Sequence, residues 1–369
     1  MVHVDEAGMT KGDFHKLRCR WVDKGDATFI ASDLDLLSDR LTVQRVSFRE
    51  RGVMAGIWLV RQFLFGWVSV FRADVVVVHF GGWHALPHLF WARVFRKRSL
   101  LFLHGVDCVA IPEIGYGNFT KVTTAWVTRS CFRLARVLVP VHASLVERTD
   151  AYTLGGSGKQ GVKVHDLSCT TPIQVVPHGF DPSRWPLGEG ARNGFVTVAV
   201  DAFGTRTFRL KGIDLFIEAA SHFPDHPFTI VGALEPIPTG LPVNVTVLPL
   251  SDPRELASLY RGSLAYVQLS LSEGFGYALA EAMLSGCVPI VSAAGSLPDV
   301  SGGCGPVVRE HAPPAVVEAM QRVIQGAYVG GGAPRTSIAA RYPLERRKQA
   351  LSRLLSGQVL FADPGLGAV

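Results

Sequence analysis

Two doubly wound α/β domains are the fold that the sequence predicts. The chain has 369 residues, which is enough for two domains of ordinary size, each with its own core. Hydrophobic residues make up 48% of it and charged residues 18%, a balance typical of folded globular proteins. In both halves, short apolar runs alternate with amphipathic stretches, as strands and crossover helices do around parallel sheets.

In the first half, recognisable elements begin only after residue 26. Residues 1–26 are polar and aperiodic, so neither a first strand nor a glycine-rich loop is recognisable there. The next stretch predicts a helix and then a strand, from apolar residues at helical spacing and then in alternation: Phe29, Ile30, Leu34 and Leu37, followed by Val43 and Val46. Continuous apolar runs predict buried strands within 73–80, 99–107 and 135–145, with a crossover helix in 84–95. Residues 153–161 have the composition of a mobile surface loop.

The second half repeats this alternation. Strands are predicted within 194–202, 227–233, 243–250, 265–270, 287–295 and 305–308, and helices within 211–223, 253–263 and 277–286. The proline-rich segment Pro177–Pro186 is the predicted hinge. We therefore expect a first domain over residues 1–180, a second over 181–355 and a C-terminal tail over 356–369. Open parallel sheets bind ligands at the carboxyl ends of their strands, so the expected site is the cleft between the domains.

Residues Val53–Phe71 form the longest apolar stretch of the chain. Arg61 and Gln62 lie at its middle, and a charged side chain at the centre of a bilayer costs about 2.5–3.5 kcal/mol. We therefore expect a buried helix rather than a membrane span. Residues His88–Ser99 are basic and aromatic, as in a helix lying on an anionic membrane, although a helix with a snorkelling basic end has the same pattern.

The net charge of +6 and the pI near 9.1 favour anionic partners. Because the basic residues form small clusters rather than a long run, phosphorylated metabolites or an anionic membrane surface fit better than nucleic acid. The six cysteines form no CxxC pair and have no metal-ligand spacing, which favours reduced thiols. No signal peptide is recognised, so the expected location is the cytoplasm, with peripheral association at the inner face of a membrane as an extension of it.

The strongest motif is LSLSEGFGYALAEAMLSGCVPIVS, residues 269–292. It predicts a strand, a loop and a helix that begins at about Tyr277 and stops at Gly286. The first-turn amides and the dipole of this helix offer an anion site. Gly274 and Gly276 permit the backbone to approach a ligand closely, which a Cβ atom would prevent.

Two acids flank this predicted anion site. Glu281 follows Tyr277 by four residues and is placed to accept hydrogen bonds from sugar hydroxyls beside a phosphate. An equally good interpretation from the residues alone makes Glu273 a favourable charge at a helix N-terminus and Glu281 a surface residue.

Three segments together resemble retaining GT-B glycosyltransferases of glycosyltransferase family 4. Glu273 and Glu281 have the E-x7-E spacing within EGFGYALAEAMLSGCVPIVSAAGSLPD, which resembles the donor-site signature of that family. VPHGFDPSRW, residues 176–185, resembles its interdomain segment, and RTFRLKGIDLFIEAA, residues 206–220, its phosphate-binding loop and helix. The likeness runs in order over roughly residues 70–355. It implies the GT-B fold, in which two Rossmann-like domains face each other across a cleft.

The resemblance implies a role for each matching residue of the second half. Glu281 matches the acid that binds the nucleotide ribose, and Glu273 the acid near the transferred sugar. Arg206 and Lys211 match the basic pair that clamps the diphosphate, although Arg209 is an alternative to Arg206 and a solvated loop has the same composition. The matching backbone amides contact the sugar hydroxyls (Phe275 and Gly276) and the distal phosphate (Leu279 and Ala280).

In the first half, His104 ends a predicted strand and matches the histidine that faces the transferred sugar in this family. The competing interpretation is a hydrogen-bonded structural histidine. Asp107 in the same loop is a lesser candidate for substrate binding, and Gly81 and Gly82 follow another strand where a phosphate or an acceptor could approach.

Other polar clusters are set aside. His79, His84 and His88 have no recognised metal spacing, so no metal site is predicted. Asp33 and Asp35 spell D-x-D, but residues two apart on a helix point to different faces and cannot chelate one ion. His142 and Ser144 lack the acid and the turn geometry of a hydrolase triad.

The resemblance implies transfer of a sugar from a nucleotide-diphosphate donor to a glycan or lipid-linked acceptor, with retention at the anomeric carbon and no cofactor or metal. Two departures from the family pattern are the unrecognised first strand and Asp299, which stands where relatives usually carry glutamate. They leave open a rival hypothesis, a catalytically silent accessory protein that binds sugar nucleotides. A phosphorylase or an epimerase on the same architecture fits the motifs less well.

Overall fold

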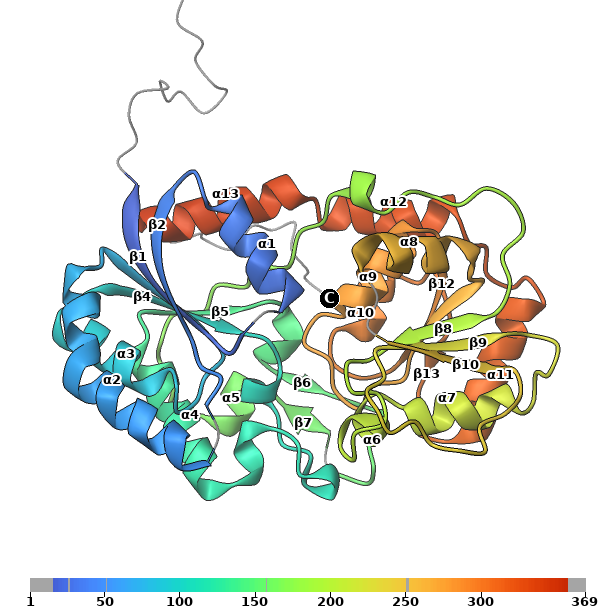
Figure 1. Cartoon of the computed structure of the whole chain (residues 1–369), viewed down its shortest axis with the longest axis horizontal. Helices are drawn as coiled ribbons and strands as arrows, with labels where there is room; N and C mark the ends of the chain where they lie inside the picture. Colours follow the sequence, from blue (N-terminus) through green and yellow to red (C-terminus); the bar gives the residue numbers. More distant parts are fainter. Residues whose placement is uncertain (1–15, 26, 51, 157, 250–251, 358–369) are drawn as a thin grey trace, which may run out of the picture.

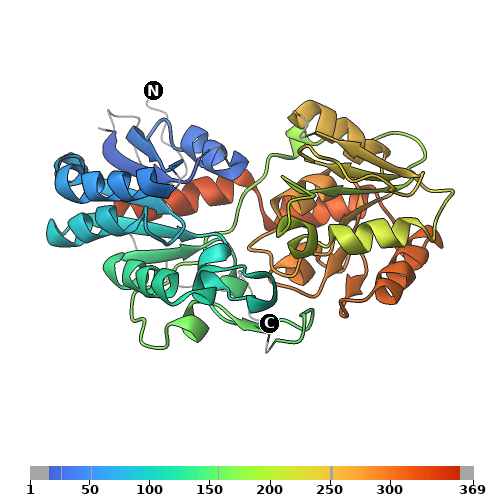
Figure 2. The ribbon, with the colours of Figure 1, turned by 60° about the horizontal axis from the view of Figure 1, so that its bottom comes forward.

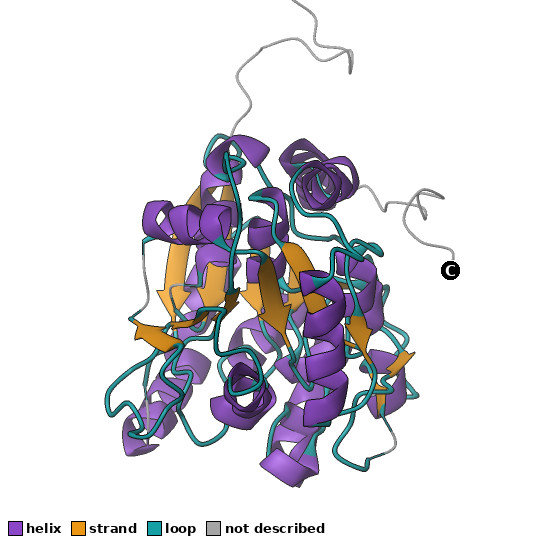
Figure 3. Ribbon diagram, turned by 90° about the vertical axis from the view of Figure 1, so that its right-hand side faces the viewer, coloured by secondary structure: helices purple, strands orange, loops and turns teal. Residues whose placement is uncertain are grey.

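The computed structural model describes residues 16–357 apart from residues 26, 51, 157, 250 and 251. Most of the predicted tail and the first 15 residues therefore lie outside the described residues. Two α/β domains stand side by side, and in each of them helices lie on both sides of a parallel sheet (Figures 1 and 3). The predicted fold class is confirmed.

The first domain is built on a five-stranded sheet of order β2-β1-β3-β4-β5. Its strands are β1 (Leu17–Asp23), β2 (Leu41–Ser47), β3 (Val75–His79), β4 (Arg98–Leu103) and β5 (Val137–Pro140). Its main helices are α1 (Thr28–Leu36), α2 (Gly52–Arg72), α3 (Leu86–Val94) and α4 (Val122–Leu134). A small antiparallel hairpin, β6 (Arg148–Thr149) with β7 (Lys159–Gln160), and the short helix α5 (Val162–His165) follow. Short 3-10 helices cover Val106–Cys108, Pro112–Ile114, Asn118–Thr120 and Ala143–Leu145.

The second domain has a six-stranded sheet of order β10-β9-β8-β11-β12-β13. Its strands are β8 (Phe195–Val198), β9 (Phe228–Val231), β10 (Val245–Leu248), β11 (Ala265–Gln268), β12 (Val288–Ser292) and β13 (Val307–Val308). Its helices are α6 (Thr207–Leu210), α7 (Ile213–Ala220), α8 (Pro253–Gly262), α9 (Tyr277–Leu284), α10 (Leu297–Ser301), α11 (Pro313–Ile324) and α12 (Gly332–Arg341). In both sheets the strand order reverses beside the first strand of the domain, which is where ligands of doubly wound sheets bind.

The strand β1 corrects the expectation that residues 1–26 hold no recognisable strand. It pairs in parallel with both β2 and β3 and lies inside the sheet. Its charged residues hid it: Arg18 donates to Asp74 at 2.8 Å, and Arg20 is buried with a 3.4 Å hydrogen bond to Gln62. Arginines at alternate positions, one exposed and one buried, make a central strand look polar in the sequence.

Two segments connect the domains. The first carries the 3-10 helix Pro182–Arg184, within the predicted hinge, and the second is residues 342–344. They pair with each other, because the Phe180 amide donates to the Tyr342 carbonyl at 2.9 Å and the Leu344 amide to the Phe180 carbonyl at 3.0 Å.

After the second crossing, α13 (Leu344–Ser356) returns to lie over the first domain beside α1 (Figure 1). Its apolar residues Leu351, Leu354 and Leu355 belong to the core cluster that contains Trp21 of β1 and Ile30 of α1. The last helix of the chain thus completes the first domain.

Two further expectations change. Residues 153–161 do not form a simple surface loop, since they lead into β7 and line the junction between the domains. The helix expected to be buried is α2, and only 11% of its most apolar 18-residue window is buried. One side of α2, with Gly66 and Val70, packs on the domain, while the other side faces outward.

Candidate active site

The loops at the carboxyl ends of both sheets meet between the domains. In the second domain, the loop after β11 leads into α9 through Gly276, whose φ of 86° and ψ of 58° are left-handed. The helix begins at Tyr277, as predicted, and Gly286 with φ 92° follows its end. The Ala280 amide donates to the Gly276 carbonyl at 3.1 Å, so it is engaged within the helix rather than offered to a phosphate. The amides of residues 277–279 precede this first intrahelical donor, so they are the candidate anion site.

Glu273 and Lys211 meet from two different loops. Lys211 Nζ donates to Glu273 Oε2 at 2.7 Å, and Gln268 Nε2 donates to the same oxygen at 2.6 Å. The side chain of Glu273 is 17% exposed and that of Lys211 29% exposed, so both are accessible from one side. Glu273, which the resemblance assigns to the transferred sugar, is therefore paired with Lys211, which it assigns to the diphosphate.

The predicted basic pair flanks the short helix α6. Arg206 is the residue before it, Lys211 the residue after it, and Gly212 with φ 66° then starts α7. A Cβ atom at Gly212 would collide with Leu269, so the loop after β11 and the start of α7 pack tightly. Arg206 and the alternative Arg209 are both exposed.

Glu281 lies one turn into α9, as expected, and is partly buried. Burial raises the pKa of its carboxyl group to about 8, and the charge of Arg184 acts in the opposite direction. Because Arg184 belongs to the hinge, the conformation of the hinge and the ionisation of this acid are linked.

His104 lies in a stack of rings at the end of β4. Its Nε2 and the Nδ1 of His79 share a hydrogen bond of 3.0 Å, and the ring centroid of Phe29 lies 4.5 Å away. Among the described residues, the buried Nδ1 of His104 has no hydrogen-bond partner. Burial and the neighbouring His79 keep the pKa of His104 well below its ordinary range, so the ring is neutral at pH 7.

Asp107 is fully buried and organises the two glycine loops, so its predicted contact with substrate is corrected. Its Oδ2 accepts from the Gly81 amide at 3.0 Å, and its Oδ1 accepts from the amides of His104 and Gly105 at 3.2 and 3.1 Å. Burial raises the pKa of Asp107. Gly82, with φ 152°, adjoins the loop that Asp107 holds in place.

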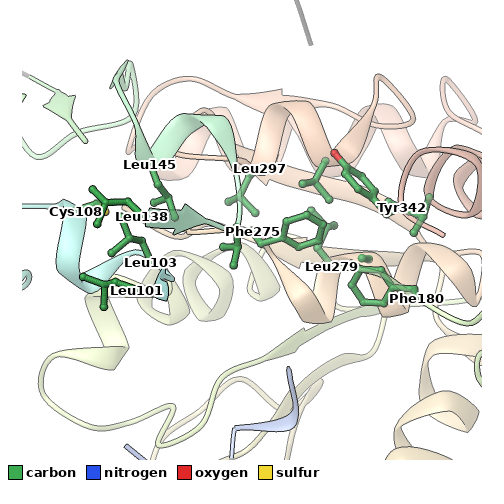
Figure 4. Close-up of a cluster of buried hydrophobic side chains, with 14 of the residues drawn as sticks. Leu101, Leu103, Cys108, Leu138, Leu145, Phe180, Phe275, Leu279, Leu297 and Tyr342 are labelled. Carbon is green, nitrogen blue, oxygen red and sulfur yellow. The ribbon is translucent and has the colours of Figure 1, made fainter. Parts of the chain in front are cut away.

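The two halves of the site touch through their backbones. A Cβ atom at Gly274 would overlap the carbonyl oxygen of His104, so the glycine admits the first domain itself rather than only a ligand. The ring of Phe275 is buried in a hydrophobic cluster that spans the domains, with ring centroids of Tyr342 and Phe180 at 5.0 and 5.9 Å (Figure 4). His104 and Glu273 are therefore brought to one place.

A buried ion pair at the junction was not predicted from the sequence. Arg148 Nε lies 2.8 Å from Asp150 Oδ2, and each side chain is 7% exposed. Arg148 also donates to Ser272 Oγ at 3.0 Å, and Asp150 accepts from the Gly295 amide at 2.8 Å. Both residues belong to the first domain and both bonds cross to the second. No local sequence pattern indicates this role, because their partners in the second domain, Ser272 and Gly295, are more than 100 positions away in the chain.

His142 forms a second bridge. Its Nε2 lies 2.7 Å from Asp299 Oδ2, so the acid thought to be missing near His142 and Ser144 is supplied by the second domain. The backbone amide of Ser144 already donates to His142 Nδ1 at 3.1 Å, so this nitrogen is an acceptor and the ring donates from Nε2. The hydrogen bond from His142 lowers the pKa of Asp299. His142 Nδ1 also lies 2.9 Å from Ser144 Oγ, so Asp299, His142 and Ser144 form one hydrogen-bonded row that joins the two domains.

A cavity of 390 Å³ opens at the same junction. Ile111 and Tyr152 line it from the first domain, and Leu271 and Ser272 from the second. Tyr116 lies close enough to Glu273 and Arg206 for their charges to act on its hydroxyl group, whose pKa is raised mainly by burial. Within the part of the chain that the structure describes, no group of three or more His, Cys, Asp or Glu side chains could hold a metal ion.

Solved structures with the same architecture include those of glycosyltransferases. Sucrose-phosphate synthase from Thermosynechococcus elongatus is similar with a TM-score of 0.66 at 13% identity, over 93% of this chain and 99% of that one. The lipopolysaccharide outer core galactosyltransferase WaaB gives 0.65 at 14%, over 93% and 100% of the two chains. The chain has the GT-B fold. Anabaena HepE in complex with UDP and glucose gives 0.65 at 14%, over 92% and 100%.

The GT-B likeness extends to sequence in one domain. Residues 202–328 match the model of the family described as Glycosyl transferases group 1. This range contains Arg206, Lys211, Glu273 and Glu281, which are the charged residues predicted for the donor site. No curated protein sequence matches the chain.

Proposed function

We propose that this GT-B protein is a retaining glycosyltransferase that moves a sugar from a nucleotide-diphosphate donor to an acceptor hydroxyl group. The main observation behind this proposal is the contact between Lys211 and Glu273 in the loops before α7 and α9. Both residues lie within the range that matches group 1 glycosyl transferases. Similar structures support a nucleotide donor, since HepE contains UDP and glucose.

The diphosphate would bind where positive charge gathers. The amides of residues 277–279, Lys211 and Arg206 line one side of the loop after β11, and an anion there competes with Glu273 for Lys211. Once released, the Glu273 carboxylate is free to accept hydrogen bonds from hydroxyl groups of the sugar. Glu281, farther along α9, is placed for the ribose.

During transfer, positive charge develops on the sugar and negative charge on the leaving diphosphate. Lys211, Arg206 and the helix amides stabilise the leaving group, which is the part that a metal ion plays in other enzymes. We propose that they suffice, so that EDTA leaves the activity unchanged. His104 is neutral, and its buried Nδ1, which has no partner among the described residues, would bond to a sugar hydroxyl that reaches it. In the proposed front-face attack, the leaving phosphate takes the proton of the acceptor.

The test starts from donor binding. Thermal stabilisation by a panel of UDP, ADP and GDP sugars identifies the donor, because a ligand at a hundred times its Kd adds about 2.7 kcal/mol to stability. Incubation with that donor and analysis by NMR then shows whether nucleotide diphosphate is released and whether the product keeps the anomeric configuration. Binding without any turnover, with or without acceptors, would contradict the proposed enzyme.

The site assignment is tested with single substitutions. Lys211→Ala is expected to weaken donor binding by about 10- to 100-fold, since a hydrogen bond to a charged group contributes roughly 1.5–3 kcal/mol. Arg206→Ala should weaken it as well, while Arg209→Ala, which removes another exposed arginine three residues away, should leave it unchanged. Calorimetry measures the three constants. Unchanged affinity of Lys211→Ala would overturn the site.

A further inference from the structure

The exposed apolar side chains of the molecule gather on one layer. Of the twenty large hydrophobic residues that are exposed in the described part of the chain, thirteen belong to α2, α3, the start of α4 and the loop before α3. These three helices lie side by side on the outer face of the first domain (Figures 1 and 2). Water-soluble monomers seldom expose apolar surface in such a concentration.

The outward side of α2 is an unbroken apolar stripe. Its members follow one another at alternating spacings of four and three residues, so they share one helix face: Val53, Ile57, Val60, Leu64, Trp67 and Phe71. Their exposed fractions run from 41% to 81%. The opposite side holds Gly66 and Val70, which are buried against the domain. The stripe is therefore surplus to what folding requires of this helix.

The stripe continues onto α3. Phe90 is 39% exposed and Val94 51% exposed, and the ring centroid of Phe90 lies 6.0 Å from that of Phe63 on α2. The ring of Phe71 at the end of α2 packs edge-on against Phe95 at 5.3 Å. The outward residues of α2 and α3 thus form one surface, here called the α2–α3 face.

The charge around this face is almost entirely positive. Residues 52–106 contain one acidic residue, Asp74, which is paired with Arg18, and six basic ones: Arg61, Arg72, Arg93, Arg96, Lys97 and Arg98. Lys97 Nζ lies 5.6 Å from the ring centroid of Phe71, so cation and apolar surface adjoin directly. Apolar and aromatic side chains with a basic border are the composition of helices that lie in the interface of anionic bilayers.

We propose that the α2–α3 face docks on the surface of an anionic lipid bilayer. A second copy of the chain suits this surface less well, because two such faces would bring six basic residues against six. A transmembrane span also fits poorly, although α2 has the length and composition for one. Its inner side packs on α3 and β1, and Gln62 accepts a hydrogen bond from the buried Arg20, so insertion would dismantle the first domain.

The placement has a consequence that rests on the proposed function. Trp83, which is 42% exposed, lies in the loop between β3 and α3, next to Gly81 and Gly82 at the candidate site. An exposed aromatic side chain of the first domain therefore lies in a loop of the candidate site. An acceptor carried on a lipid would approach along this edge, and the protein would act at the membrane surface without crossing it.

The experiment is co-sedimentation of the full chain with phosphatidylcholine vesicles, with and without phosphatidylglycerol. We expect binding to the mixed vesicles that falls as salt rises. Leu64→Glu should reduce the partition constant by about tenfold, because it removes one leucine side chain that the bilayer would bury. Leu234→Glu is the matched control: Leu234 lies in the second domain and is 56% exposed, against 59% for Leu64, so this variant should bind like the natural chain.

Charge is tested in the same assay. Arg93→Glu on α3 should weaken binding to the mixed vesicles, while Arg254→Glu on α8 of the second domain should not. Equal thermal unfolding of the variants shows that the fold is kept. Absence of binding to mixed vesicles, or equal effects of Leu64→Glu and Leu234→Glu, would overturn the proposal. So would a dimer in light scattering that Leu64→Glu separates, or protein that resists alkaline extraction from membranes. These measurements need no sugar donor, so their result on membrane binding does not depend on whether the protein transfers sugars.

Discussion

At the scale of single residues, Glu281 carries a pH dependence that its surroundings explain. Burial raises the pKa of its carboxyl group from 4.5 to about 8, so the folded protein holds a proton there that the unfolded chain releases. Stability contributed by this proton is complete below pH 4.5 and is lost as the pH rises to about 8. The total loss is at most about 5 kcal/mol, since each unit of pKa shift corresponds to 1.36 kcal/mol.

The prediction is a smaller pH slope in Glu281→Gln. Denaturant unfolding between pH 5 and 8 should show wild-type stability falling by up to about 4 kcal/mol more than that of the variant. Glu273→Gln, which removes the other acid of the candidate site, serves as the comparison variant. Parallel pH profiles of wild type and Glu281→Gln would contradict the burial of this acid.

Residues of the site were predictable where spacing along the chain carries the chemistry. Glu273, Glu281 and the glycines of residues 274–276 lie in one strand-loop-helix unit, so their arrangement follows from local geometry. Arg148 and Asp150 could not be found in this way, because their partners Ser272 and Gly295 come from the other domain. Asp107 follows a strand, a position at which a polar residue can either bind substrate or hold a loop in place. The sequence does not distinguish these roles, whereas the structure shows that backbone amides of the loops occupy the Asp107 carboxylate.

At the scale of elements, α1 and α13 are joined by a buried ion pair. Arg347 Nε and Nη2 contact Asp33 Oδ1 and Oδ2 at 2.6 and 2.5 Å, and both side chains are nearly inaccessible. Arg347 Nη1 also donates to the carbonyl groups of Val176 and Pro177 at the hinge. One of the two aspartates set aside as a metal-binding decoy is therefore a structural link between distant segments.

The prediction compares the two aspartates of that D-x-D. Asp33→Ala should lower the free energy of unfolding by about 3–5 kcal/mol, because it leaves the Arg347 guanidinium buried without its counter-charge. Asp35→Ala on the exposed side of the same helix should change it by less than about 0.5 kcal/mol. Urea denaturation of both variants measures the difference. Similar losses of unfolding free energy in the two variants would show that helix propensity, and not the ion pair, causes the destabilisation.

Elements were predictable where apolar periodicity matched burial, and two exceptions have physical causes. The strand β1 has Arg18 and Arg20 at positions that a central strand usually gives to apolar residues, and their partners Asp74 and Gln62 are remote in sequence. Helix α2 is apolar on all sides, which normally indicates burial. Here the outward stripe is exposed, so apolar composition does not place this helix in the core.

At the scale of the whole molecule, the two domains are held against each other by polar bridges around a shared hydrophobic cluster. Arg148 and Asp150 are nearly buried, whereas the side chain of Asp299 is 63% exposed where it meets His142. The cluster around Phe275 includes residues from both domains (Figure 4). The general arrangement followed from the alternating pattern of the sequence, but the return of α13 did not, because nothing in its amphipathic pattern says which domain its apolar face covers.

The exposed bridge provides a test of how firmly the domains are closed. Asp299→Ala removes the 2.7 Å contact with His142, and a charged contact this exposed contributes about 0.2–1 kcal/mol. At the upper end of that range, the ratio of closed to open molecules falls about fivefold, which small-angle scattering detects as a larger radius of gyration.

The acid form of Asp299 should have the same effect. Because its pKa is depressed by the hydrogen bond from His142, the bridge contributes at pH values above the ordinary pKa of an aspartate and is lost as the pH falls through the lowered value. Saturating nucleotide should draw the variant back to the wild-type radius if the donor contacts both domains. A variant whose radius matches wild type with and without nucleotide would show that the buried Arg148–Asp150 pair and the Phe275 cluster close the molecule on their own.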